Sequence, residues 1–396
     1  MPKVNPKILS WARETAGLSL AEAAKKLYIS DTQTASAIDR LKEYEETGEI
    51  TRPLLVRMSK QYRRPLLTFY MSAPPRKGNR GQDFRTLPKD YSKSENAFLD
   101  VLIRNVTARQ SIVRAVLEED EEVKPLSFIG SCKTSDGVSK VLVSIRERIK
   151  VKQTDFYSQP SPDDAFALLR ESVEAEGIFV LLIGDLGNYR TAMEPEIFRG
   201  FSLADSIVPF IVINDRDSHA AWAFTLLHEL THLWLGQTGV SNSFATQTIE
   251  KFCNDVAGEF LLPDDQLNML DVNDSTPFDE ALEEISAFAS DRNLSSSMVA
   301  YKLFRSGVIQ EQTLSSLSHA FRDLWIQNRS KKREASKASS AAADYYLVRR
   351  HRIGKSLIQL VDRMMLEGSL STSRAGTVLG VKAKNVGYLI EVARSG

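Results

Sequence analysis

The sequence contains few of the residues that mark secreted or membrane-embedded proteins. It has two cysteines in 396 residues, Cys132 and Cys253, which are far apart and lack the spacing of a metal-ligand pair. This usage argues for a reducing compartment and against a disulfide framework. No apolar run approaches the roughly 20 residues that cross a bilayer, and the first residues lack the apolar core of a secretory signal. We therefore expect a cytoplasmic protein.

The chain also lacks a net charge, because 51 basic residues balance 51 acidic ones. The two signs are nevertheless separated along the chain. Residues 1–91 hold 17 basic and 10 acidic residues, residues 92–325 hold 20 and 36, and residues 326–396 hold 14 and 5. The basic ends could contact nucleic acid, remain solvated, or dock on the acidic middle.

The length and the hydrophobic content of 42% predict two or three domains with real cores. Helix signals such as the capping box of Ser19 and Glu22 fill the first part of the chain, and a Pro/Gly/Arg-rich stretch follows it. A Lys/Ser/Ala-rich stretch precedes the last helices. We predict a helical domain (1–74), a linker with a strap helix (75–125), a central domain with strands and a helical tail (126–325), a second linker (326–345) and a basic helical domain (346–396).

The motif that carries chemistry is His-Glu-x-x-His, formed by His228, Glu229 and His232. It lies in an apolar segment predicted to be a helix from about 220 to 235, and residues four apart on a helix face the same way. Both imidazoles can therefore reach one ion. Glu229 is rotated by about 100° from His228 and can act as a general base toward a water activated by zinc. The pattern predicts one zinc ion per chain.

A third protein ligand is expected from the downstream segment 249–263, because catalytic zinc has three protein ligands and one open position. Glu250 and Asn254 share a helical face, so Glu250 could bind the metal while Asn254 orients a histidine. Glu259 and Asp255 are the alternative ligands. Tyr301 is a candidate to stabilise the oxyanion, although it could equally be an ordinary aromatic side chain.

These residues resemble the ImmA/IrrE family of zinc metallopeptidases. The family typically has Glu-x-x-Ala-Asn followed by Phe-Ala-Ala-x-Leu-Leu-Met-Pro, and this chain departs at Cys253, Val256 and Leu262. The resemblance implies an α+β, zincin-like (gluzincin-type) domain with a small mixed sheet, flanked here by all-helical, helix-turn-helix-like domains. It also implies that an edge strand before the motif helix, Ile211, Val212, Ile213 and Asn214, pairs with the substrate backbone.

Residues 5–72 resemble a Cro/repressor-type helix-turn-helix domain, but the segment from Asp31 to Ala37 has few side chains suited to reading bases. A second helix pair, within 278–306, is expected to pack on the catalytic domain because its surroundings are acidic. A third pair, which begins after Ser371 and turns at Gly380, has the same helix–turn–helix pattern in basic surroundings. DNA or an acidic protein face could be its partner.

The leading hypothesis is a zinc-dependent endopeptidase that cleaves or inactivates a partner transcriptional repressor, as the family resemblance implies for stress, phage or mobile-element regulation. The substrate would be a repressor or antitoxin encoded nearby. The alternative is a DNA-binding regulator, or a toxin–antitoxin or phage-defence component, whose zinc domain senses metal or docks a partner. The presence of Glu229 favours the enzyme, because a binding module needs no general base.

Overall fold

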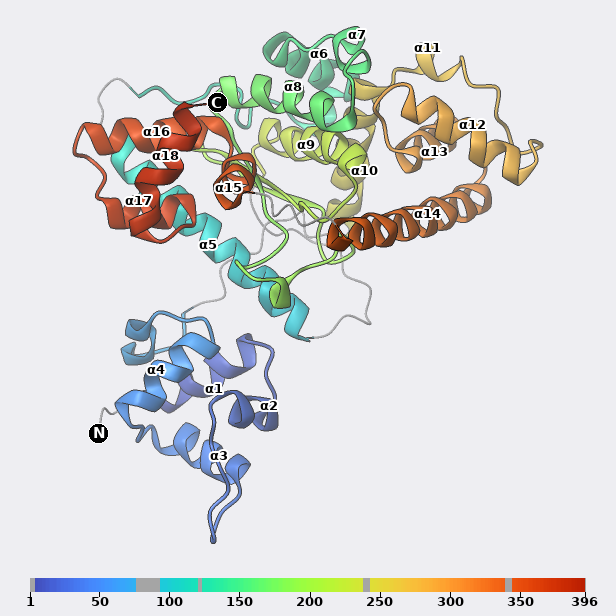
Figure 1. Cartoon of the computed structure of the whole chain (residues 1–396). Helices are drawn as coiled ribbons and strands as arrows, with labels where there is room; N and C mark the ends of the chain where they lie inside the picture. The colour runs from blue at the N-terminus through green and yellow to red at the C-terminus, as the bar shows by residue number, and fades with distance from the viewer. Residues whose placement is uncertain (1–3, 76–92, 120–122, 238–242, 339–343, 396) are drawn as a thin grey trace. The chain divides into compact units, whose positions relative to one another are not determined.

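The computed structural model describes residues 4–75, 93–119, 123–237, 243–338 and 344–395 (Figure 1). These residues form two compact units. Of the described residues, the first unit contains 4–75, 93–105 and 185–197, and the second contains 106–119, 123–184, 198–237, 243–338 and 344–395. No helix among the described residues is long and apolar enough to cross a membrane. Residues 76–92 and 120–122 of the predicted linker and strap helix (75–125) lie outside the described residues.

The first unit contains a small helical bundle near the N-terminus. Its helices are α1 (Pro6–Thr15), α2 (Leu20–Lys26), α3 (Ala37–Thr47), α4 (Arg52–Gln61) and the 3-10 helix η1 (Leu66–Tyr70). The predicted capping box is confirmed, since Ser19 and Glu22 exchange side-chain and backbone hydrogen bonds at the start of α2. Gly48 ends α3 in the left-handed conformation, with φ of 71°. The core side chains include Ile8, Leu41 and Phe69, each fully buried.

The connection between α2 and α3 differs from that of a helix-turn-helix. α2 ends at Lys26 and α3 begins at Ala37, whereas the helices of that motif are joined by about three or four residues. α3 also carries four acidic and two basic residues, a balance that repels phosphate. The helical content of this unit is confirmed, while a DNA-reading arrangement of α2 and α3 is not shown.

The second unit is built on a three-stranded sheet of order β1-β3-β2. β1 (Phe179–Leu182) is parallel to β3 (Phe210–Ile213), and β2 (Gly200–Leu203) is antiparallel to it. All three strands are buried. The predicted strands around 177–185 and 207–215 are confirmed, but β3 is central rather than at an edge. β2, which the sequence analysis did not predict, takes the edge position.

Helices cover this sheet and form most of the second unit. α8 packs on β1, and α9 packs on both β2 and β3. The helices of the second unit before the C-terminal group are α6 (Val138–Ile149), α7 (Gln153–Tyr157), α8 (Pro162–Ala175), α9 (His219–Trp234), α10 (Ser243–Leu261), α11 (Asp264–Leu267), α12 (Phe278–Ser290), α13 (Ser296–Arg305) and α14 (Glu311–Ala338). α5 (Lys93–Leu117) runs through both units.

The buried core of the second unit lies around α9. Apolar side chains occur all around α9, so nearly the whole helix is buried rather than a single stripe. Trp234 stacks on Phe128 with ring centroids 4.4 Å apart. Gly236, with φ of 64°, follows α9 as predicted, and a Cβ there would lie 2.7 Å from the Cα of Gly130. Only a residue without a side chain fits this crossing. The α12–α13 pair joins the same core, as expected.

The C-terminal part of the chain corrects two boundaries. The segment predicted as a linker (326–345) is helical as far as Ala338, because Ala, Lys, Arg and Glu are good helix formers. The last helices are α15 (Tyr345–Ile353), α16 (Lys355–Leu366), α17 (Thr372–Leu379) and α18 (Val386–Arg394). They belong to the second unit rather than to a separate domain, and α15 packs on β1.

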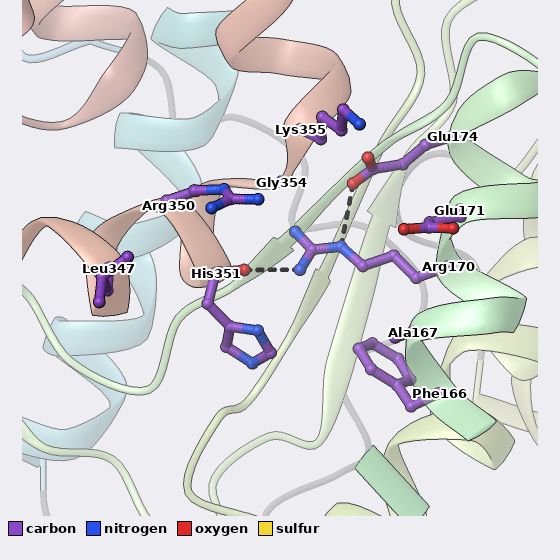
Figure 2. Close-up of a pocket in the computed structure, with 10 residues that line it drawn as sticks. All are labelled: Phe166, Ala167, Arg170, Glu171, Glu174, Leu347, Arg350, His351, Gly354 and Lys355. Carbon is purple, nitrogen blue, oxygen red and sulfur yellow. Dashed lines mark hydrogen bonds and ion pairs between the residues drawn. The ribbon is translucent and has the colours of Figure 1, made fainter. Parts of the chain in front are cut away.

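A buried ionic joint fixes these helices to α8 (Figure 2). Arg170 binds Glu174 one turn along α8, at 2.9 Å, and donates to the backbone carbonyl of His351 at 2.6 Å. It also donates to the carbonyl of Val180 in β1. Burial lowers the pKa of Arg170 and raises that of Glu174. A charge this deeply buried is stable only when paired, so the joint depends on all of these contacts.

Candidate metal centre

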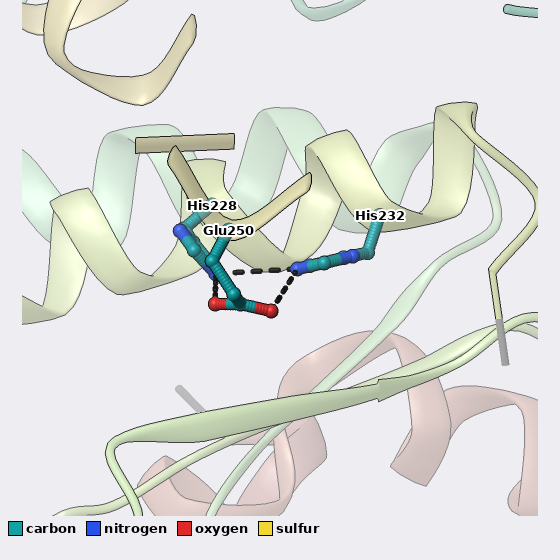
Figure 3. A group of neighbouring side chains, drawn as sticks. All are labelled: His228, His232 and Glu250. Carbon is teal, nitrogen blue, oxygen red and sulfur yellow. Dashed lines mark hydrogen bonds and ion pairs between the residues drawn. The ribbon is translucent and has the colours of Figure 1, made fainter. Parts of the chain in front are cut away.

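Helix α9 presents its two histidines from the middle of the core. His228 and His232 are one turn apart, and each is 1% exposed. α10 packs against α9 and brings Glu250 to the same place. Among the described residues, these three form the only group of three or more histidines, cysteines and carboxylates whose donor atoms converge. Figure 3 shows the two rings and the carboxylate pointing toward one another.

The spacing of the donor atoms fits a tetrahedral ion. The Nε2 atoms of His228 and His232 are 3.2 Å apart. Glu250 places its carboxylate oxygens 3.3 Å from Nε2 of His228 and 3.5 Å from Nε2 of His232. A tetrahedral zinc ion with ligand distances of about 2.0–2.2 Å holds its donors about 3.3–3.6 Å apart. Two nitrogens and one carboxylate oxygen also match the donor chemistry of a catalytic zinc site.

Glu229 lies beside this group and packs against the sheet. Its side chain is 2% exposed. A Cβ added to Gly200 in β2 would lie 2.9 Å from Oε1 of Glu229 and 2.7 Å from Cγ2 of Thr225. β2 therefore passes directly over the motif helix at the predicted general base. The sequence analysis gave Gly200 no role, and the only local signal at this position is a glycine between the large side chains of Arg199 and Phe201.

The two alternative ligands, Glu259 and Asp255, lie elsewhere on α10 and form ion pairs with basic side chains of α13. Lys302, itself 6% exposed, places Nζ 2.6 Å from Glu259 and 2.7 Å from Asp264. Asp255 accepts hydrogen bonds from Nε and Nη2 of Arg305, at 2.7 and 2.6 Å. Neither carboxylate belongs to the converging group. The structure thus brings Glu250, and not its rivals, to the histidines.

The remaining predicted residues are placed less directly. Tyr301 donates its hydroxyl proton to Asp255 over 3.3 Å, and burial, with the nearby Asp255 carboxylate, raises its pKa to about 12. The Oδ1 atom of Asn254 is buried and has no hydrogen-bond partner among the described residues. Oxyanion stabilisation by Tyr301 and orientation of a histidine by Asn254 therefore remain predictions.

A pocket of about 290 Å³ lies elsewhere, at the joint between α8 and the C-terminal helices (Figure 2). Its walls include Phe166, Glu171, Arg350 and Lys355, and none of its lining residues belongs to the converging group. This pocket is therefore separate from the candidate metal centre.

Comparison with protein families agrees with this geometry. Residues 185–304 match the model of the Peptidase_M78 family, which is described as an IrrE N-terminal-like domain. The matched stretch contains β2, β3, α9 and α10, and so all three donors and Glu229. No curated protein and no solved structure matches the chain. Over this stretch the chain is similar to a family of metallopeptidases, which supports a peptidase.

Proposed function

We propose that the protein is a zinc-dependent endopeptidase. The observation that carries the proposal is the spacing of 3.2–3.5 Å among the donors of His228, His232 and Glu250, with a buried glutamate next to the first histidine. In this proposal the three donors hold one zinc ion, and Glu229 is the general base. A module that only binds a partner would not need a carboxylate at that position.

The chain's own residues perform the proton transfers. A bound zinc ion would supply a Lewis acid that polarises the scissile carbonyl and lowers the pKa of water to near 7. Glu229 accepts the proton of the attacking water on its carboxylate, and then gives that proton to the leaving amine nitrogen. The burial of α9 keeps bulk water from competing for the carboxylate.

The substrate strand is reassigned from β3 to β2. β3 has a neighbouring strand on both sides and cannot accept another. β2 is an edge strand and packs on α9 beside Glu229. We therefore propose that an extended peptide pairs with β2. Because β2 is buried along its length, the proposal requires that its outer edge opens when substrate binds.

A repressor or antitoxin remains the proposed substrate, and the argument for it is the family resemblance. Such partners are small proteins with segments that can adopt the extended conformation required at a sheet edge. The low cysteine content is compatible with a reducing compartment, and we propose that the chain meets such a partner there.

The test combines metal analysis with an unbiased substrate screen. The purified protein is incubated with a proteome-derived peptide library and with candidate repressors, and new termini are sequenced by mass spectrometry. We expect about one zinc per chain and sequence-selective cleavage. Glu229→Gln should keep the zinc and lose cleavage, whereas His228→Ala or His232→Ala should lose both. Cleavage by the glutamine variant at the wild-type rate would contradict the mechanism.

A further inference from the structure

The C-terminal helices form a compact helix-turn-helix. α17 ends at Leu379, and a three-residue turn (380–382) leads into η4 (Ala383–Asn385), which continues directly into α18. Ala375 and Leu379 of α17 and Leu389 of α18 are completely buried, and α16 packs on both helices. A turn of three or four residues between two packed helices is the connection that this motif uses.

Two glycines make the sharp turn feasible. Gly380 ends α17 in the left-handed conformation, with φ of 64°. A Cβ at Gly376 would lie 2.9 Å from the carbonyl oxygen of Val381 and 3.1 Å from the amide nitrogen of Ala383. A larger residue at position 376 would therefore push the second helix away from the first. The turn is also fixed from outside, since Arg349 of α15 donates to the carbonyl of Gly380.

The outer face of this module is cationic. Lys382 and Lys384 are exposed in the turn and in η4, and Arg374 is exposed in the first turn of α17. Tyr388 is 61% exposed one turn beyond Lys384. Residues 345–396 contain nine Lys or Arg and three Asp or Glu. The positive end of the α18 dipole adds to this charge. In a helix-turn-helix, this is the end of the recognition helix that meets base edges and phosphates.

The other two helix pairs of the chain lack this combination. α3 carries four acidic and two basic residues and follows a long connection. The pair α12–α13 spans 278–305 with five acidic and three basic residues, and it is packed into the catalytic core. Of the three helix pairs, only α17–α18 combines a short turn, glycines at that turn and an exposed basic face in the part of the chain that the structure describes.

We propose that α17–α18 bind duplex DNA, with η4 and α18 in the major groove and Arg374, Lys382 and Lys384 on phosphates. Tyr388 lies on the exposed face of α18 and would meet the groove. This function does not rest on the proposed peptidase activity. A single module with three phosphate contacts should bind DNA weakly. The logarithm of its association constant should fall linearly with the logarithm of the salt concentration, with a slope of about −2.7.

The experiment uses the full chain and a fluorescent DNA duplex of random sequence, about three helical turns long. Fluorescence anisotropy is measured at about 50 and 200 mM salt, across which three phosphate contacts predict an affinity loss of about 40-fold. Lys382→Glu/Lys384→Glu should abolish binding, and Lys382→Arg/Lys384→Arg should retain it. Circular dichroism and a melting curve verify that each variant is folded.

The matched control reverses two exposed lysines of the N-terminal helices, Lys42→Glu/Lys60→Glu, which change the total charge by the same amount. This control should bind DNA as well as the wild type. The proposal is overturned if the wild type does not bind at low salt, if the two reversal variants lose equal affinity, or if an A-form RNA duplex binds as tightly. The last result would exclude major-groove insertion, because that groove is too deep and narrow in RNA.

Discussion

Replacing Gly200 by alanine tests whether β2 lies over Glu229, the proposed general base. The added methyl group would lie 2.7 Å from Cγ2 of Thr225 and 2.9 Å from Oε1 of Glu229. Ordinary van der Waals contact begins at about 3.4 Å. The carboxylate of Glu229 or the strand must therefore move by about 0.5 Å, which is a large displacement in a core packed to crystal density.

The expected effect is on the rate rather than on the metal. The three atoms closest to the methyl group belong to Thr225 and Glu229 and not to the three donors, so zinc content should stay at the wild-type level. A general base contributes about 10²–10⁴ in rate, and a misplacement of about 1 Å can cost about 10²-fold. A shift of about half that distance predicts a fall in kcat/KM of roughly 10-fold to 100-fold.

The assay measures kcat/KM on a peptide obtained from the library screen, with zinc content measured in parallel. Adding Thr225→Ser to Gly200→Ala removes the closest contact and should recover part of the activity. Gly387→Ala is the matched control, since a Cβ there meets nothing within 4 Å. Wild-type kcat/KM in Gly200→Ala would refute the placement of β2 against Glu229, and loss of zinc would show that the effect lies in the metal group.

Three further changes test other parts of the structure. Glu250→Gln should lower zinc content strongly, while Glu259→Gln on the same helix should leave it unchanged; equal loss would contradict the choice of ligand. Arg170→Ala breaks a buried ion pair and should destabilise the fold by about 3–5 kcal/mol in chemical denaturation, and a change below about 1 kcal/mol would contradict the joint. Asp205 is partly buried, which raises its pKa, but amide donors of the following turn and Arg114 outweigh burial and lower it overall. Its contribution to stability is therefore present above the unfolded pKa and is lost as pH falls through the lower folded value. Asp205→Asn should destabilise the fold at neutral pH, and its difference in stability from the wild type should shrink as pH falls and vanish once the folded carboxyl is protonated; a difference that keeps its neutral-pH size in acid would refute the assignment.

Local signals were sufficient for the motif helix and for the histidine pair. The apolar segment that carries His228 and His232 is one continuous helix, because it is too long for a buried strand and Gly236 ends it. The choice between Glu250 and Glu259 also follows from helical geometry once α10 is known to be continuous. Nine residues rotate by about 900°, so the two carboxylates lie on opposite faces. One face meets the histidines, and the other meets Lys302.

The order of the strands could not be obtained locally. β2 is four residues long and begins with a glycine, so its propensity for a strand is weak. It becomes a strand because β3 offers an edge and α9 offers a surface on which only a small residue fits at position 200. The sequence analysis also missed the continuation of α14 to Ala338, although here the local propensity was strong. The low apolar content suggested a linker, whereas intrinsic helix propensity was the stronger determinant.

The position of the C-terminal helices explains why the two sheet edges differ. The amides of Phe179 and Ile183 in β1 bond to β3, so Val180, between them, directs its carbonyl away from the sheet. That carbonyl accepts a hydrogen bond from Arg170, and α15 packs on the same strand. A peptide therefore cannot extend the sheet at β1 without displacing a buried guanidinium. β2 is the remaining edge of the described sheet, and it is the edge beside Glu229. The contacts of Arg170 that hold the proposed DNA-binding helices in place thus also prevent a peptide from pairing with β1.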